Sequence, residues 1–161
     1  MGNFAGVDVR DESGIDVDVA DIAALSEYLL EQLGMAADAE LSITLVDEEA
    51  MAELHVEWMD EPGPTDVLSF PMDELMEPAP GAPRVSGTLG DVVLCPAVAQ
   101  RQAVVAGHDA RHEMRILLTH GVLHLLGHDH AEPTEELAMF ARQNELVAEY
   151  AAVVTGPVGE Q

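Results

Sequence analysis

Three histidines in the second half of the chain have the type and spacing for metal chemistry. His120 and His124 are four residues apart, and His130 follows six residues later. Residues four apart lie one turn apart on an α-helix, so the first two imidazoles leave the same helix face. Gly127 permits the left-handed conformation that ends a helix, and a reversal there can bring His130 back to the other two. The spacing predicts three neutral imidazoles around one metal ion, with a fourth position open for water.

A histidine-rich run can also be a weak compositional metal tract or a set of surface side chains. Here the run lies in a segment that is apolar almost all round the helix, which indicates burial. Two buried histidines on one face need partners, and a metal supplies them. His128, next to Asp129 on the reversing loop, is expected to form a wall or to support a ligand rather than to bind the ion. The apolar residues of the segment are Ile116, Leu117, Leu118, Val122, Leu123, Leu125 and Leu126.

The histidine spacing matches the zinc-protease pattern H-E-x-x-H-x-x-G-x-x-H except at its second position, which is Gly121. In those proteases the glutamate is the general base that activates water. Glycine has no proton acceptor in its side chain, so the usual peptidase base is missing. A carboxylate from elsewhere, such as Glu113 or Asp129, could replace it, and a zincin-type metallopeptidase stays open as an alternative. The simplest interpretation is a metal-dependent hydrolase of another substrate class.

Two further segments accompany the histidine run. Residues 64–71 read Pro-Thr-Asp-Val-Leu-Ser-Phe-Pro, and residues 89–95 read Leu-Gly-Asp-Val-Val-Leu-Cys. Together with His-Gly-Val-Leu-His-Leu-Leu-Gly-His-Asp-His at 120–130, they resemble the YbeY family of bacterial rRNA-maturation metallo-endoribonucleases. The three motifs occur in the family's order and at similar separations. The resemblance covers about residues 40 to 131 by motif.

The resemblance implies a small α+β domain in which His120, His124 and His130 hold one zinc ion per chain. It implies a single-strand-specific, zinc-dependent endoribonuclease that processes ribosomal RNA, matures the 3′ end of 16S rRNA and removes defective ribosomes. The implied partners are ribosomal RNA and the small ribosomal subunit, with a ribosome-associated GTPase and a small-subunit ribosomal protein. Three imidazoles discriminate poorly among divalent transition metals, so the identity of the ion stays open. A non-catalytic ribosome-associated adaptor, in which zinc only stabilises the fold, is a second alternative.

The chain departs from the family pattern at three positions. His128 stands where the family usually has tyrosine or phenylalanine. His55 and Met59 stand where it usually has asparagine and arginine. An arginine near the metal would be expected to hold a phosphate, so its loss puts the phosphate clamp in doubt. An arginine from another element, such as Arg84 or Arg115, could supply the missing guanidinium.

Charge is the feature that fits RNA binding least. The 161 residues include 31 acidic residues against six arginines and no lysine, a net charge of −25. Proteins that grip RNA through its phosphates normally present a basic patch. The acids are spread from Asp8 to Glu160, which indicates a solvated acidic surface rather than an acidic tail. RNA would have to be held by local attraction or delivered by a partner.

The rest of the composition places the chain among folded cytoplasmic proteins. Its length fits one domain spanning 1–161. There is no apolar stretch long enough to cross a bilayer and no secretory leader at the N-terminus, so a membrane location is not expected. Cys95 ends an apolar run and is interpreted as a small buried residue rather than a nucleophile.

Periodicity predicts a single compact α+β domain with a small mixed sheet, about five helices and the metal helix at the centre. A proline-rich surface loop is expected at 77–87 and a frayed tail at 155–161. Pro64, Thr65, Asp66 and Ser69 are expected to line the substrate groove. The expected strands are 7–10, 41–46, 66–70 and 89–94, and the expected helices are 19–33, 47–59, 96–106, 112–126 and 133–153.

Overall fold

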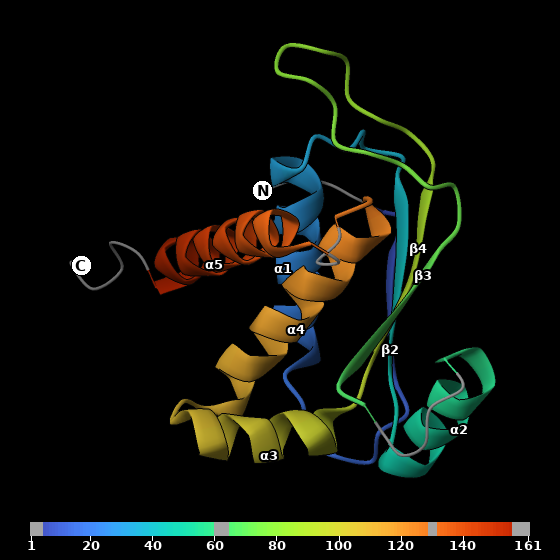
Figure 1. Ribbon diagram of the computed structural model, residues 1–161, viewed down its shortest axis with the longest axis vertical. Coiled ribbons are helices and arrows are strands. Elements are labelled where there is room, and N and C mark those ends of the chain that lie inside the picture. Colours follow the sequence, from blue (N-terminus) through green and yellow to red (C-terminus); the bar gives the residue numbers. More distant parts are fainter. Residues whose placement is uncertain (1–4, 60–64, 129–131, 156–161) are drawn as a thin grey trace.

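The computed structural model describes residues 5–59, 65–128 and 132–155, which form four strands and five helices (Figure 1). The α+β class, the small sheet and the number of helices agree with the sequence-based prediction. In chain order the elements are β1 (Val7–Asp11), α1 (Val19–Gln32), β2 (Glu40–Leu45), α2 (Glu48–Met59), β3 (Val67–Pro71), β4 (Thr88–Leu94), α3 (Pro96–Ala106), α4 (Ala110–Leu125) and α5 (Pro133–Thr155).

The sheet is mixed, in the order β1-β2-β4-β3. β1, β2 and β4 run parallel, while β3 pairs antiparallel with β4, with Val67 opposite Leu94 and Pro71 opposite Gly90. Helix α1 supplies the crossover from β1 to β2, as parallel pairing requires. The long connection from β3 to β4 contains the proline-rich segment 77–87, where Val85 forms an isolated bridge with Met35. This topology leaves β3 at the edge of the sheet, facing the metal helix.

Alternate side chains of the strands point to opposite faces of the sheet and build two cores. On one face, Leu41, Ile43 and Leu45 of β2 pack with the buried sides of α1 and α4. On the other, Val93 of β4 joins Met51 of α2 in a smaller cluster. Cys95 is fully buried in that smaller cluster, and burial raises the pKa of its thiol. The interpretation of Cys95 as a buried structural residue is thereby confirmed.

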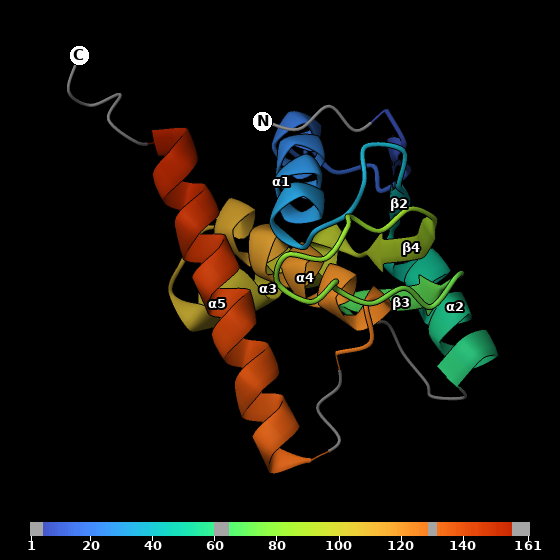
Figure 2. The same ribbon diagram turned by 90° about the horizontal axis from the view of Figure 1, so that it is seen from above.

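Helix α4 occupies the centre of the domain, as expected of the metal helix. It contacts α1, α3 and α5 as well as β3 and β4 (Figure 1, Figure 2). In the view from above, β3 and the body of α5 lie on different sides of α4 (Figure 2). Residues of α4 can therefore contact the edge of the sheet on one side and α5 on the other.

Both ends of α4 are fixed by local chemistry. The helix begins earlier than the expected residue 112, because the side chain of Asp109 accepts a hydrogen bond from the backbone N–H of His112 at 2.8 Å. At the other end Gly127 has φ +91°, and the N–H of His128 donates to the carbonyl of Leu123 at 3.0 Å. The left-handed glycine therefore ends the helix as the sequence predicted.

None of the helices in the described part of the chain combines the length and apolar character needed to cross a bilayer. The proposed tail falls almost wholly outside the described residues, because α5 continues to Thr155.

Candidate metal and nucleic-acid site

His120 and His124 lie one turn apart on α4, and their rings converge. The two Nε2 atoms are 3.1 Å apart, with the rings tilted by 72°. Two imidazoles bound to one tetrahedral zinc ion at about 2.0–2.1 Å would place their nitrogens about 3.3 Å apart. The donor set of this pair therefore fits a zinc ion. His130 lies outside the described residues, so its part in the predicted tripod stays a prediction.

Helix α5 orients the first histidine from behind. The Nδ1–H of His120 donates to the Oε1 atom of Gln143 at 2.8 Å, and Gln143 is buried. With the proton held at Nδ1, the lone pair of Nε2 points toward His124. Phe140, one turn earlier on α5, stacks beside the same imidazole with ring centroids 5.9 Å apart and an interplanar angle of 21°. A polar and an aromatic contact from one helix thus fix this ring.

A cavity of about 300 Å³ opens in front of the two histidines. Strand β3 forms its opposite wall, so Asp66 and Ser69 line it as predicted, whereas Thr65 is not among the lining residues and Pro64 lies outside the described residues. The hydroxyl of Ser69 donates to the carbonyl of Gly121 at 2.9 Å and ties β3 to α4. The Nε2 of Gln102 donates to Oδ2 of Asp66 at 3.2 Å, which holds that carboxylate at the rim. The site is therefore a groove between a sheet edge and a helix.

The structure gives a steric reason for Gly121 at the position of the protease glutamate. A Cβ atom at residue 121 would lie 2.8 Å from Cγ1 of Val92 and 3.2 Å from Cγ2 of Val67. Real Cβ atoms essentially never approach to 2.8 Å, so a larger residue requires the Val92 side chain or its strand to shift. Position 121 faces the strands, and a glutamate there would be driven into the sheet.

The neighbouring titratable residues point elsewhere. The Nε2 of His128 lies 2.8 Å from Oε1 of Glu77, which attaches the proline-rich segment to the end of α4. The carboxylate of Glu113 is buried and pairs with His108 at 2.5 Å near the start of α4. The suggestion that Glu113 reaches the metal site is therefore wrong. Asp129, the other candidate base, lies outside the described residues.

Neither of the arginines suggested as a replacement phosphate clamp is available. Arg84 donates to the carbonyl of Met35 at 2.9 Å and pairs with Glu31 at 2.7 Å, at the end of α1. Arg115 makes two 2.9 Å hydrogen bonds to the carboxylate of Asp21, and the ion pair is largely buried. The suggestion that either one substitutes for the missing guanidinium is wrong. Met59 ends α2, and its side chain is not among those described.

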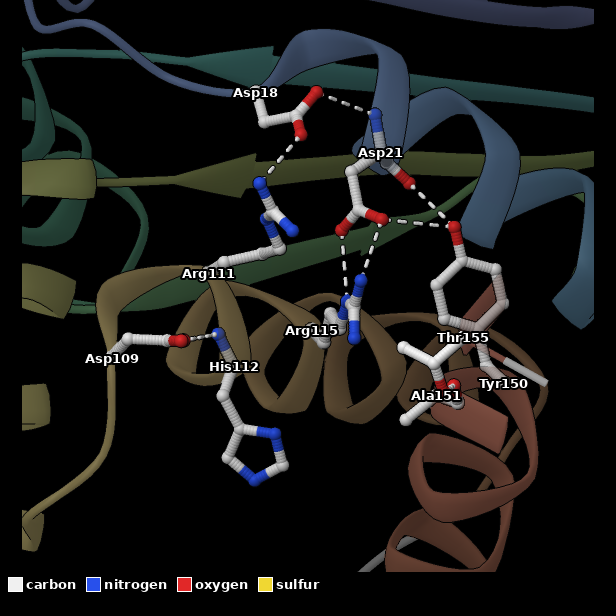
Figure 3. Close-up of polar contacts among 9 residues, drawn as sticks. All are labelled: Asp18, Asp21, Asp109, Arg111, His112, Arg115, Tyr150, Ala151 and Thr155. Atoms are coloured by element: carbon white, nitrogen blue, oxygen red, sulfur yellow. Dashed lines mark hydrogen bonds and ion pairs between the residues drawn. The ribbon is translucent and has the colours of Figure 1, made fainter. Parts of the chain in front are cut away.

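Figure 3 shows the network that holds Arg115. The hydroxyl of Tyr150 donates to the Asp21 carboxylate at 3.0 Å, and the guanidinium of Arg115 lies 5.0 Å from the Tyr150 ring centroid. Burial and this hydrogen bond raise the pKa of Tyr150 to about 12. A second cavity of about 200 Å³ lies beside this network, lined by Asp18 and Arg111 among others. Arg111 pairs with Asp18 and Arg115 with Asp21, which joins α4 to the start of α1, and the Tyr150 hydroxyl adds α5 to the network.

Like Arg115, every other arginine in the chain pairs with a carboxylate. The sequence has six arginines and no lysine, and all six lie in described segments. Each has a carboxylate oxygen within 4 Å. No arginine therefore presents an unpaired positive charge on the acidic surface. The partners are Asp8 for Arg10, Glu31 for Arg84, Glu48 for Arg101, Asp18 for Arg111, Asp21 for Arg115, and Glu77 with Glu145 for Arg142.

Sequence reasoning missed Gln143 and Phe140. Their spacing of three residues shows that they share a face of α5. Nothing in the local sequence shows that this face meets His120, because the contact joins residues 23 positions apart.

Comparison with known proteins agrees with the three motifs. Residues 8–151 match the family described as Endoribonuclease YbeY. The chain is 59% identical over 142 residues to a protein named Endoribonuclease YbeY from Thermobifida fusca, covering 88% of this chain and 92% of that one. A protein of the same name from Pseudarthrobacter chlorophenolicus is 57% identical over 141 residues, covering 88% and 90%.

A solved structure shares the fold. The solution structure of TM1509 from Thermotoga maritima superposes with a TM-score of 0.63 at 23% identity, over 96% of this chain and 95% of that one. Family match, close relatives and fold agree, and the chain belongs to the Endoribonuclease YbeY family.

Proposed function

We propose that this protein is a zinc-dependent endoribonuclease that cuts single-stranded RNA, and that it acts in ribosomal RNA processing. The observation that carries the proposal is the pair of imidazole Nε2 atoms, 3.1 Å apart, at the wall of a groove in a chain of this family. A groove of about 300 Å³ between one strand and one helix suits an extended single strand better than a duplex. Maturation of the 3′ end of 16S rRNA and removal of defective ribosomes are the roles we infer from the family.

The zinc ion is assigned to His120, His124 and His130. A zinc ion at such a site supplies Lewis-acid chemistry, since it lowers the pKa of water to about 7 and polarises a phosphoryl oxygen. The chain's own residues prepare the site. Gln143 keeps the His120 proton on Nδ1, and the apolar side chain of Val67 on β3 helps to exclude bulk water from the groove.

A peptidase is the weaker candidate for this site. Residue 121 faces the sheet, and Glu113 is held by His108, so neither supplies a base to the groove. A non-catalytic adaptor on the ribosome has one observation in its favour, the complete pairing of the arginines on an acidic protein. The acidic surface also favours delivery of the RNA by a partner. We assign these partners as the small ribosomal subunit, one of its proteins and a ribosome-associated GTPase, in the cytoplasm.

The decisive experiment measures metal content and RNA cleavage on one preparation. Purified protein is incubated with end-labelled single-stranded RNA, with the same sequence as a duplex, and with casein. We expect cleavage of the single strand alone, loss of cleavage with a chelator, and recovery on adding zinc. His124→Ala should lose both metal and cleavage. His112→Ala is the matched control, because it removes a histidine two turns before His120 on the same helix, and should retain both.

Three outcomes would contradict the proposal. Chelator-sensitive hydrolysis of casein without RNA cleavage would establish the peptidase. One zinc ion per chain with no hydrolysis of any substrate would establish the adaptor. Full metal content in His124→Ala would remove the assigned site.

A further inference from the structure

Phe140 is an exposed aromatic ring of α5 in contact with a histidine that lines the groove. It is 38% exposed, although its ring stacks beside the imidazole of His120, which itself lines the groove. Leu137, one turn earlier, is 72% exposed. Residues three apart lie on the same side of a helix, so the two side chains make one apolar strip on α5, and Phe140 brings that strip into contact with His120.

The charge distribution decides what such a strip can contact. Every arginine of the chain is engaged by a carboxylate, and Glu136, one turn before Phe140, is exposed. A phosphate backbone would be repelled from this part of α5, whereas an uncharged base would not. Stacking on an aromatic ring is the other general source of affinity for single strands, because every base presents a flat π face.

We propose that Phe140, supported by Leu137, stacks against a nucleobase next to the bond that is cut. The proposal rests on the proposed function and names how the same site recognises its substrate. The ring is pre-positioned by its contact with His120, so little side-chain freedom is lost when a base arrives. The base faces α5 while the sugar-phosphate chain follows the groove along β3, away from the acidic residues of α5.

The test pairs protein variants with altered RNA. Stopped-flow fluorescence measures the affinity of a short single-stranded RNA before cleavage, for the wild type and for Phe140→Ala, Phe140→Leu and Phe140→Trp. The same RNA is made with one base removed at each position in turn. Val153→Ala is the matched control, because Val153 is an exposed apolar residue at the far end of the same helix. Metal content is measured for every variant, so that an effect on His120 is recognised.

We expect Phe140→Ala and Phe140→Leu to bind about tenfold more weakly, Phe140→Trp to bind at least as well as the wild type, and Val153→Ala to be unchanged. At one RNA position, base removal should weaken wild-type binding about tenfold and leave Phe140→Ala binding unaffected. The dependence of affinity on salt should be the same for the wild type and Phe140→Ala, because stacking displaces no counterions.

The outcomes separate this inference from the proposed function. If Phe140→Leu binds like the wild type, or base removal costs the same in both proteins at every position, the stacking role is overturned. If the wild type binds RNA with this base dependence but does not cleave it, the proposed nuclease function fails and the stacking role stands. If the wild type binds no RNA, both are overturned.

Discussion

Replacing Gly121 with glutamate tests whether position 121 faces the sheet or the groove. The substitution completes the zinc-protease pattern in the sequence. If residue 121 faced the groove, the new carboxylate could act as the peptidase base. The structure instead directs the side chain at Val92 and Val67. We therefore expect Gly121→Glu to lose stability and to gain no peptidase activity.

The magnitude can be worked out in two steps, beginning with Gly121→Ala. Alanine is favoured over glycine in a helix interior by about 0.8–1.0 kcal/mol. The added Cβ would lie 2.8 Å from Cγ1 of Val92, and overpacking of this kind costs about 1–3 kcal/mol. The net expectation is a loss of roughly 0–2 kcal/mol in the free energy of unfolding. Glutamate adds the burial of a carboxylate, which brings the expected loss to about 4 kcal/mol or more.

The assay is urea unfolding followed by circular dichroism, with casein hydrolysis measured on the same samples. Combining Gly121→Ala with Val92→Ala should remove most of the alanine penalty, because the contacted methyl group is gone, and the double-mutant cycle isolates that contact. Ala152→Glu is the control, because it introduces a glutamate at an exposed position of α5 and should change stability by less than about 0.5 kcal/mol. A Gly121→Glu protein of unchanged stability that hydrolyses casein would refute the steric argument.

Three further predictions concern the surroundings of the site. Burial and Asp21 raise the pKa of Tyr150 from 10.0 to about 12, so its stabilisation is complete below pH 10 and is lost as the pH approaches 12. Urea unfolding across that window should show a decline in the free energy of unfolding that is smaller in Tyr150→Phe by roughly 2–3 kcal/mol. Gln143→Leu removes the hydrogen-bond acceptor for His120 and should weaken zinc affinity about 10- to 100-fold in a chelator competition. Gln143→Glu keeps an acceptor and should retain most of the affinity. Equal zinc affinities for the two variants would contradict the orienting role of Gln143. The buried hydroxyl of Thr119 has no hydrogen-bond partner among the described residues, so Thr119→Val should raise the free energy of unfolding by about 1 kcal/mol, and a loss would show that the hydroxyl is satisfied.

The elements that hold the site could be predicted because their signals are local. Gly127 ends α4 with a positive φ as its type predicted, and Asp47 caps α2 by accepting from the N–H of Ala50 at 2.8 Å. The pairing of β3 with β4 could not be predicted, because an alternating strand does not specify its partner or direction.

The chemistry beside the histidines was less predictable, since it depends on contacts between distant residues. Arg115 looked available for a phosphate because its residue type suits one, yet its partner Asp21 lies 94 positions earlier. Gln143 carries no sequence signal of its role, because glutamine on a helix is ordinarily a surface residue. The ligand role of His130 and the effect of Met59 at the arginine position stay predictions.

Helix α5 also fixes how α1 and α4 are oriented relative to each other. Gln143 accepts a hydrogen bond from His120 on α4, and Tyr150, seven residues later, donates one to Asp21 on α1. Seven residues are nearly two full turns, about 10 Å along the axis, so both side chains leave the same side of the helix. One inserted residue between them would rotate the direction of one side chain by about 100° relative to the other. The number of residues between Gln143 and Tyr150 is therefore constrained, whereas the types of the residues between them are not. An insertion there should disturb the metal site as much as loss of Gln143.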